Sequence, residues 1–200
     1  MNRTRLPGRR IEAVVIGASA GGVEALLTLL SDLPTTWRLP LVIVMHLPEG
    51  RDSLLARVFG QRLRMPVLEA ADKAVITDGT LYFAPPSYHL SIERERVFSL
   101  SCEPPVLWSR PSIDVLMSSA ADAYGAALAG ILLTGANQDG ARGMRDIRIA
   151  GGLTAVQDPE DAEIATMPRA AIALHAPDFV LPLRELRELL VQLDTRDTDD

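Results

Sequence analysis

Apolar and polar residues alternate in blocks that fit a strand–helix repeat. The run Ala13–Ile16 is continuously apolar, as in a strand buried on both faces. After it, Val23, Leu26, Leu27 and Leu30 recur at the spacing of one buried helical face. Further apolar runs lie at 41–45, 66–69, 128–133, 153–157 and 179–181, and helical patterns lie at 53–63, 113–123, 140–149, 168–174 and 183–193. This alternation predicts an α/β fold with a doubly wound, mainly parallel sheet.

The segment between Asp78 and Leu100 departs from this rhythm. Asp78-Gly79 is a turn signal, and short β-like runs follow at 81–84, 89–92 and 96–100. Pro85 and Pro86 between these runs suit an edge better than a central strand. We therefore expect an antiparallel excursion at one edge of the sheet.

Composition fits one globular domain. We expect a flexible lead-in at 1–10, a single domain at 11–193 and an acidic tail at 194–200. The net charge of -6 and the 4% aromatic content argue against a nucleic-acid partner. A single cysteine, Cys102, favours a reducing cytoplasm, and no run of roughly 18 apolar residues supports membrane insertion. The three histidines show no metal spacing, so neither a metal nor a cofactor is expected.

The turn Gly17–Gly22 joins the first strand to the first helix, and its reactive group is the hydroxyl of Ser19. Small residues let the backbone reverse tightly and leave the helix N-terminus open, where free N–H groups and the helix dipole favour a developing oxyanion. The Gly17-x-Ser19-x-Gly21 pattern matches a nucleophile elbow. Taken alone, the same pattern also fits a phosphate-binding turn or a purely structural one.

Two other strand ends carry residues that complement a serine nucleophile. His46 closes the second predicted strand, and Asp139 lies in the loop after the strand at 128–133. Because parallel strands place their carboxyl ends at one edge of the sheet, we expect Ser19, His46 and Asp139 to meet there. Serine would be the nucleophile, histidine its general base, and aspartate the group that orients the base.

Competing patterns fit less well. A dinucleotide site requires a carboxylate at the end of the second strand, where this chain has His46. An α/β-hydrolase order could use Asp139 or Asp158 followed by His175, but too few strands precede the serine turn. We expect His175 in a surface loop, and His89 in a structural role or at the rim of the site.

Six stretches together resemble the catalytic domain of the bacterial chemotaxis-receptor protein-glutamate methylesterases. They are IGASAGGVEAL, VIVMHLPEG, DGTLYFAPPSYHL, RPSIDVLMSSAADAYG, GILLTGANQDGARGM and AVQDPEDAEIATMPRAAI, in the family's order between Ile16 and Ile172. The resemblance implies that Ser19, His46 and Asp139 are the catalytic residues. It implies hydrolysis of glutamyl methyl esters on the cytoplasmic helices of receptors, with release of methanol, and related enzymes also deamidate glutamine. From turn position, we expect the backbone amides near Ala20 and Ala136 to form the oxyanion hole.

The chain departs from the family pattern without losing a catalytic residue. Ala20 stands where the family often has threonine, the acid loop reads Gly135-Ala136-Asn137-Gln138-Asp139-Gly140, and Ala162–Ala165 replaces a cysteine-bearing segment. Many relatives also carry an N-terminal receiver domain, whereas this chain starts directly at the first catalytic strand. We therefore expect a stand-alone catalytic domain, and the sequence does not identify its regulatory partner. Two alternatives stay open: a related esterase or amidase with another substrate, and a non-catalytic module that docks on receptor helices.

Overall fold

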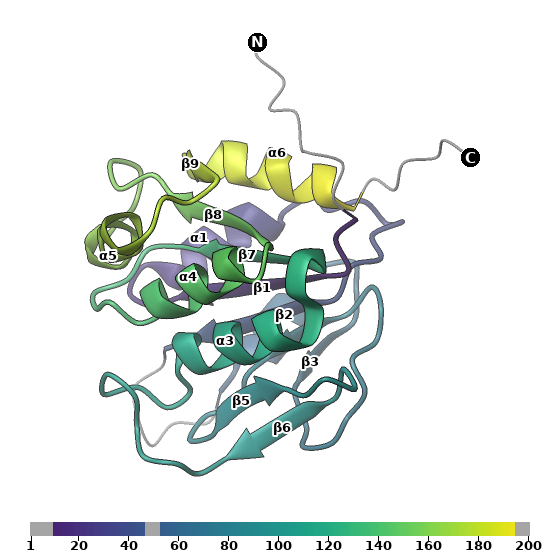
Figure 1. Ribbon diagram of the computed structural model, residues 1–200. Coiled ribbons are helices and arrows are strands. Elements are labelled where there is room, and N and C mark those ends of the chain that lie inside the picture. Colours follow the sequence, from purple (N-terminus) through teal and green to yellow (C-terminus); the bar gives the residue numbers. More distant parts are fainter. Residues whose placement is uncertain (1–9, 47–52, 195–200) are drawn as a thin grey trace.

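The computed structural model describes residues 10–46 and 53–194, and the strands there form a seven-stranded sheet in the order β3-β4-β2-β1-β7-β8-β9 (Figure 1). Every neighbouring pair in this sheet is parallel. The strands are β1 (Ala13–Ala18), β2 (Leu41–Met45), β3 (Val67–Glu69), β4 (Leu81–Phe83), β7 (Leu128–Leu132), β8 (Leu153–Gln157) and β9 (Phe179–Leu181). The predicted doubly wound α/β class is confirmed.

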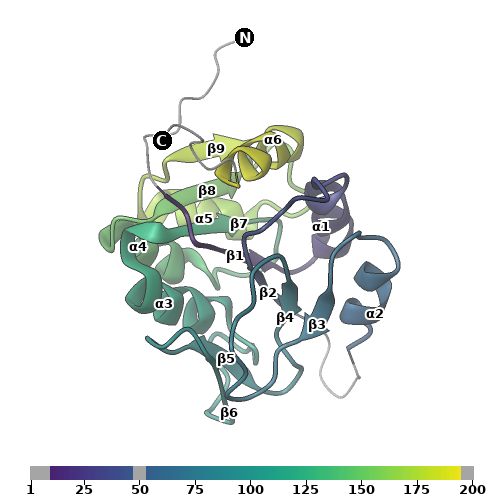
Figure 2. The same cartoon turned by 90° about the vertical axis from the view of Figure 1, so that its right-hand side faces the viewer.

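Helices cover both faces of the sheet (Figure 2). One face carries α1 (Gly22–Leu30), α2 (Leu55–Gly60) and α6 (Leu183–Leu193), and the other carries α3 (Ile113–Tyr124), α4 (Ala141–Ile149) and α5 (Thr166–Leu174). A short 3-10 turn, η1 (Gly125–Ala127), leads from α3 into β7. Successive side chains of a strand point to opposite faces, so Val14 and Ile16 pack into the core beneath α1 while Ala13 and Val15 pack beneath α3. This double burial explains why the strands are continuously apolar.

The chain reverses its direction of progress across the sheet at β1. From β1 it continues through α1 to β2 on one side, whereas β7 pairs with the other side of β1 and leads through α4 to β8. The carboxyl ends of β1 and β7 therefore flank the topological switch point, which is where open α/β sheets place their ligand sites.

The segment 78–100 differs in detail from the expectation. Leu81–Phe83 forms β4, a parallel strand inside the main sheet, because all three of its side chains are buried and only a central position covers both faces. The antiparallel pair is β5 (His89–Ile92) with β6 (Phe98–Ser101), which form a separate two-stranded sheet packed against α3. The two prolines follow β4 and separate these two parts.

The expected lead-in at 1–10 and the expected acidic tail at 194–200 lie outside the described residues, apart from Arg10 and Asp194. Within 10–46 and 53–194, no helix is long and apolar enough to cross a bilayer.

Candidate active site

The three residues expected to act together lie at the same edge of the sheet. Ala18 and Met45 are paired in the register of β1 and β2, and the backbone N–H of His46 donates to the Ala18 carbonyl at 3.1 Å. Ser19 and His46 therefore leave adjacent strands side by side. Asp139 arrives from the loop between β7 and α4, with its side chain fully buried, while the His46 side chain is 11% exposed.

A partly buried hydrogen bond joins His46 to Asp139, with 2.8 Å between Nε2 and Oδ2. The same oxygen of Asp139 accepts the backbone N–H of Ile113 at 2.7 Å. Oδ1 accepts the Ser112 hydroxyl at 2.8 Å and the backbone N–H of Asp114 at 3.0 Å. Each carboxylate oxygen thus accepts two hydrogen bonds, which saturates the group.

This environment keeps Asp139 ionised. Burial alone would favour the protonated acid, but the hydrogen bonds from His46 and from the N–H groups of Asp114 and Ile113 outweigh it and lower the pKa of Asp139. An ionised carboxylate only accepts, so Nε2 of His46 must carry the hydrogen of their bond. In neutral His46 the free lone pair is therefore on Nδ1, which is the atom that could accept a proton from a nucleophile.

Asp114 caps a second helix in the same way. Asp139 accepts N–H groups at the N-terminus of α3, and Asp114, in the first turn of α3, accepts N–H groups at the N-terminus of α4. Its Oδ1 accepts the backbone N–H groups of Gly140 at 3.0 Å and Gly143 at 2.7 Å. Burial raises the pKa of Asp114, and the nearby charge of Asp139 adds to this effect while the two amides oppose it.

The turn that carries Ser19 is tied to neighbouring strand ends by backbone contacts. Gly21 has φ 77°, and the N–H of Gly22 donates to the Ser19 carbonyl at 2.8 Å. The N–H of Ser19 donates to the Thr134 carbonyl at 3.0 Å. The amides of Ala20 and Ala136 donate to no other residue of the described part of the chain, so both are available to a ligand.

A second serine, to which the sequence analysis gave no role, lies beside His46. The Ser109 hydroxyl is 3.4 Å from His46 Nδ1, whereas Ser19 and His46 make no hydrogen bond through their side chains. Asn137 also contacts this group, since its Nδ2 lies 3.5 Å from the Ser109 hydroxyl and its Oδ1 accepts the N–H of Asp139 at 3.1 Å. The structure therefore assembles His46 with Asp139 and places Ser19 beside them.

Ser109, Ser112 and Asp114 were missed as parts of the site. All three lie in or next to the stretch RPSIDVLM, which sequence reasoning used for the resemblance without giving its residues a role. The available signal was local, because Ser112 precedes a helical pattern as an N-cap residue does. In the structure it does cap α3, and its hydroxyl also reaches Asp139.

The other two histidines lie apart from this chemistry. His89 is structural, as expected: its Nε2 contacts the Pro104 carbonyl at 3.1 Å and its Nδ1 accepts the N–H of Ser112 at 3.2 Å. His175 follows α5 and precedes β9, so it lies at the amino edge of the sheet, and burial lowers its pKa. Both of its ring nitrogens are buried and have no hydrogen-bond partner in the described structure, so His175 is more enclosed than expected.

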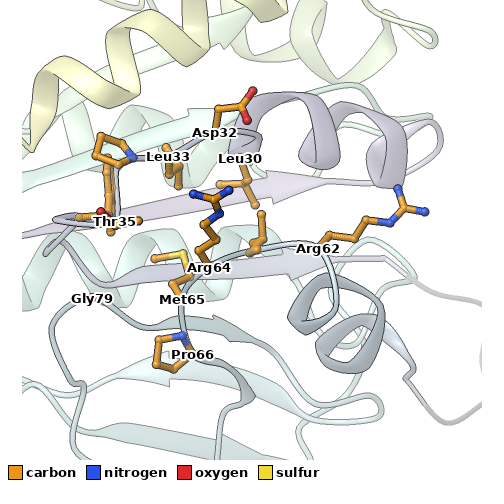
Figure 3. A pocket seen from close by; sticks show the side chains of 12 residues that line it. Leu30, Asp32, Leu33, Thr35, Arg62, Arg64, Met65, Pro66 and Gly79 are labelled. Atoms are coloured by element: carbon orange, nitrogen blue, oxygen red, sulfur yellow. The ribbon is translucent and has the colours of Figure 1, made fainter.

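A pocket of about 460 Å³ lies at the opposite edge of the sheet (Figure 3). Its lining residues precede β2, β3 and β4, and they include Asp32, Arg62 and Arg64. Since His46 and Asp139 follow their strands, this pocket does not belong to their site. Within the described residues, no group of three histidine, cysteine, aspartate or glutamate side chains could hold a metal ion.

Comparison with known proteins identifies the family. The family model described as CheB methylesterase matches residues 14–190. The chain therefore belongs to the CheB methylesterase family. The crystal structure of the Thermotoga maritima CheB methylesterase catalytic domain superposes with a TM-score of 0.86 at 30% identity, over 94% of this chain and 100% of that one.

Family members of two lengths match. A Leptospira interrogans protein with a provisional methylesterase name is 47% identical and matches over 92% of this chain and 95% of its own length. The protein-glutamate methylesterase/protein-glutamine glutaminase 2 of Anaeromyxobacter dehalogenans is 42% identical over 96% of this chain but only 56% of its own. The Myxococcus xanthus protein-glutamate methylesterase FrzG is 35% identical over 90% of this chain and 54% of its own. The chain thus spans about half the length of these longer relatives.

Gly140→Ala tests the loop that presents Asp139. Gly140 has φ 95°, and an added Cβ would lie 2.5 Å from Leu132 Cδ1 and 2.8 Å from Ile113 Cγ2. We expect the free energy of unfolding to fall by about 2–5 kcal/mol. Alanine is strained in the left-handed backbone conformation, and its Cβ overpacks the core. Urea denaturation measures this. Gly60→Ala is the control, because its nearest neighbour would be Val67 Cβ at 3.8 Å; equal stability of the two variants would contradict the role of Gly140.

Asp139→Asn tests the buried charge through the pH dependence of stability. Folding lowers the pKa of Asp139, so its ionised form stabilises the fold above the unfolded pKa of about 3.9, and this contribution disappears as the pH falls through the folded pKa. In asparagine, an NH2 group replaces one carboxylate oxygen and faces the N–H and O–H groups that donate to Asp139. We expect the variant to be less stable by about 1–3 kcal/mol at pH 7, with the difference shrinking on acidification. Denaturation from pH 7 to pH 3 measures it; a constant difference would show that the charge contributes nothing.

Proposed function

We propose that this chain hydrolyses γ-glutamyl methyl esters on chemotaxis receptors through a triad of Ser19, His46 and Asp139. The observation that carries the proposal is the buried His46–Asp139 pair at the end of β2, beside the serine turn that ends β1. Family membership supplies the substrate class, since curated relatives are named protein-glutamate methylesterases. The residues of the triad and its mechanism are inferred from the geometry.

Esterolysis requires a proton acceptor beside the nucleophile. Ser19 attacks the ester carbonyl carbon while Nδ1 of His46 takes the hydroxyl proton, and ionised Asp139 stabilises the imidazolium through Nε2. The imidazolium then gives its proton to the departing methoxy group, so methanol leaves and the glutamyl group stays on Ser19. Water attacks this acyl-enzyme with His46 again as base, which restores Ser19 and releases the glutamate side chain.

Two features favour Ser19 over Ser109 as the nucleophile. Ser19 lies in the turn that leads into α1, where the free amide of Ala20 and that of Ala136 can donate to the oxyanion. Ser109 instead lies in the loop before α3, and its 3.4 Å contact with His46 is long for a hydroxyl hydrogen bond. Catalytic hydrogen bonds often tighten only when substrate is bound, so the free enzyme's lack of a Ser19–His46 bond is compatible with Ser19 as nucleophile.

The proposal extends to the setting of the reaction. We take residues 11–193 as the catalytic domain and the methylated cytoplasmic helices of receptors as its partner, which places the enzyme in the cytoplasm. A side-chain amide can enter the same acyl-transfer sequence, so we also expect deamidation of receptor glutamine; the name of the Anaeromyxobacter relative includes a protein-glutamine glutaminase.

Receptor demethylation with two serine variants tests the proposal. Purified chain is incubated with radiolabelled methylated receptor, and released methanol is counted. We expect Ser19→Ala to lower kcat by about 10³-fold or more, as loss of a nucleophile does, because Ser19 is the one hydroxyl residue of the turn Gly17–Gly22. Ser109→Ala is the matched control and should keep activity within about tenfold, since it removes a contact to the base and not the attacking atom.

Labelling with a fluorophosphonate identifies the acylated residue independently. Mass spectrometry of the labelled chain should find the adduct on the peptide that contains Ser19. Ser19→Ala with undiminished methanol release would refute the triad, and an adduct on Ser109 would transfer the nucleophile to that loop.

A further inference from the structure

The loop between β6 and α3 ends in a tight turn beside His46. Val106 and Ser109 exchange both backbone hydrogen bonds, at 3.1 Å and 2.9 Å, so Leu107 and Trp108 alone form the tip. Both tip residues have positive φ, 48° and 66°, as the central residues of a type I′ turn do. The residue that closes the turn, Ser109, is the one whose hydroxyl lies 3.4 Å from His46 Nδ1.

Leu107 and Trp108 are ill suited to this position. Positive φ at both central residues is normally served by Asn-Gly or Gly-Gly, and a bulky side chain there strains the backbone. Burial does not offset the strain at Trp108, which is 97% exposed, and offsets it only in part at Leu107, which is 36% exposed. Neither local conformation nor the core of this chain explains the exposed indole at this tip. Strain of this kind concentrates at functional sites.

We propose that the Leu107–Trp108 tip is a docking element that grips the substrate helix beside the esterified glutamate. This inference rests on the proposed function. If the ester is carried by a protein side chain, the polypeptide that bears it must lie over the edge of the sheet that carries His46. A side chain one residue from Ser109 and almost wholly exposed is then covered by that polypeptide. The occupant is a receptor helix with an apolar side chain about one turn from the glutamate.

The chemistry of the tip suits such a contact. Tryptophan supplies a large rigid surface at low cost in side-chain entropy and is enriched among residues that dominate binding energy. The tip would therefore govern recognition of the protein substrate, while the bond-breaking step stays with the strand ends.

The variant Leu107→Asn/Trp108→Gly isolates the two side chains. Asn-Gly is the preferred type I′ pair, so the turn and the position of Ser109 are kept. We expect kcat/KM for methylated receptor to fall at least tenfold, mainly through KM, with turnover of p-nitrophenyl acetate within twofold and an unchanged or higher melting temperature. Ile149→Ala is the control: it removes a 77% exposed side chain at the far end of α4 and should leave both activities unchanged.

The docking role of the tip and the proposed function can fail separately. Equal receptor kcat/KM for the double variant and the unmodified chain would overturn the docking role and leave the proposed function standing. Failure of the unmodified chain to demethylate receptor would overturn both.

Fluorine NMR gives a readout independent of turnover. The chain has two tryptophans, and Trp37 is buried at 6% exposure while Trp108 is in water. In 5-fluorotryptophan-labelled Ser19→Ala, which holds substrate without turning it over, a methylated receptor cytoplasmic fragment should shift or broaden the Trp108 signal and leave the Trp37 signal in place. An unchanged Trp108 signal at receptor concentrations that saturate demethylation would overturn the proposal.

Discussion

The site depends on a pair of buried carboxylates that cap each other's helices. Asp139 accepts N–H groups at the start of α3, and Asp114 accepts N–H groups at the start of α4. The two helices must approach closely for this, and Gly143 permits it, since an added Cβ would lie 2.5 Å from Met117 Cβ. Each carboxylate thereby replaces water with helix N-terminal donors, which is why a fully buried aspartate can keep its charge. The charge on Asp139 then fixes the tautomer of His46.

The topology of the sheet supplies the other half of the arrangement. β1 and β7 are neighbours whose chains leave toward opposite faces, so their carboxyl ends open a gap into which two loops project. Thr134 ties these loops together: its carbonyl accepts the N–H of Ser19, its hydroxyl lies 2.9 Å from the Ala20 carbonyl, and its own N–H donates to the side chain of Gln157. The serine turn is therefore held by the backbone of the adjacent strand ends, which leaves the serine side chain free to react.

Sequence patterns predicted which residues lie at the strand ends, but not the contacts that packed elements make around them. Continuous apolar runs indicated a parallel sheet, and parallel strands share a carboxyl edge, so the common location of Ser19, His46 and Asp139 followed from one-dimensional information. The cap by Asp114 did not, because it depends on how closely α3 and α4 pack, and no residue pattern reports that distance. The contact of Ser109 with His46 was hidden for the same reason, since 63 positions separate the two residues. Leu81–Phe83 was assigned to the antiparallel excursion because a turn signal precedes it and two prolines follow it, and its complete burial becomes apparent only in the fold.

The residues proposed for the reaction and the tip proposed for substrate recognition are held in different ways. Asp139 accepts four hydrogen bonds, and backbone hydrogen bonds hold the serine turn, so a change at Asp139 disturbs the fold as well as the proposed reaction. The turn that carries Leu107 and Trp108 is closed by one pair of backbone hydrogen bonds between Val106 and Ser109, and Trp108 at its tip is 97% exposed. Substitutions at the tip therefore alter an exposed surface and not the hydrogen bond between His46 and Asp139. Ser109 is where the two parts meet, because it closes the turn through its backbone and reaches His46 through its side chain.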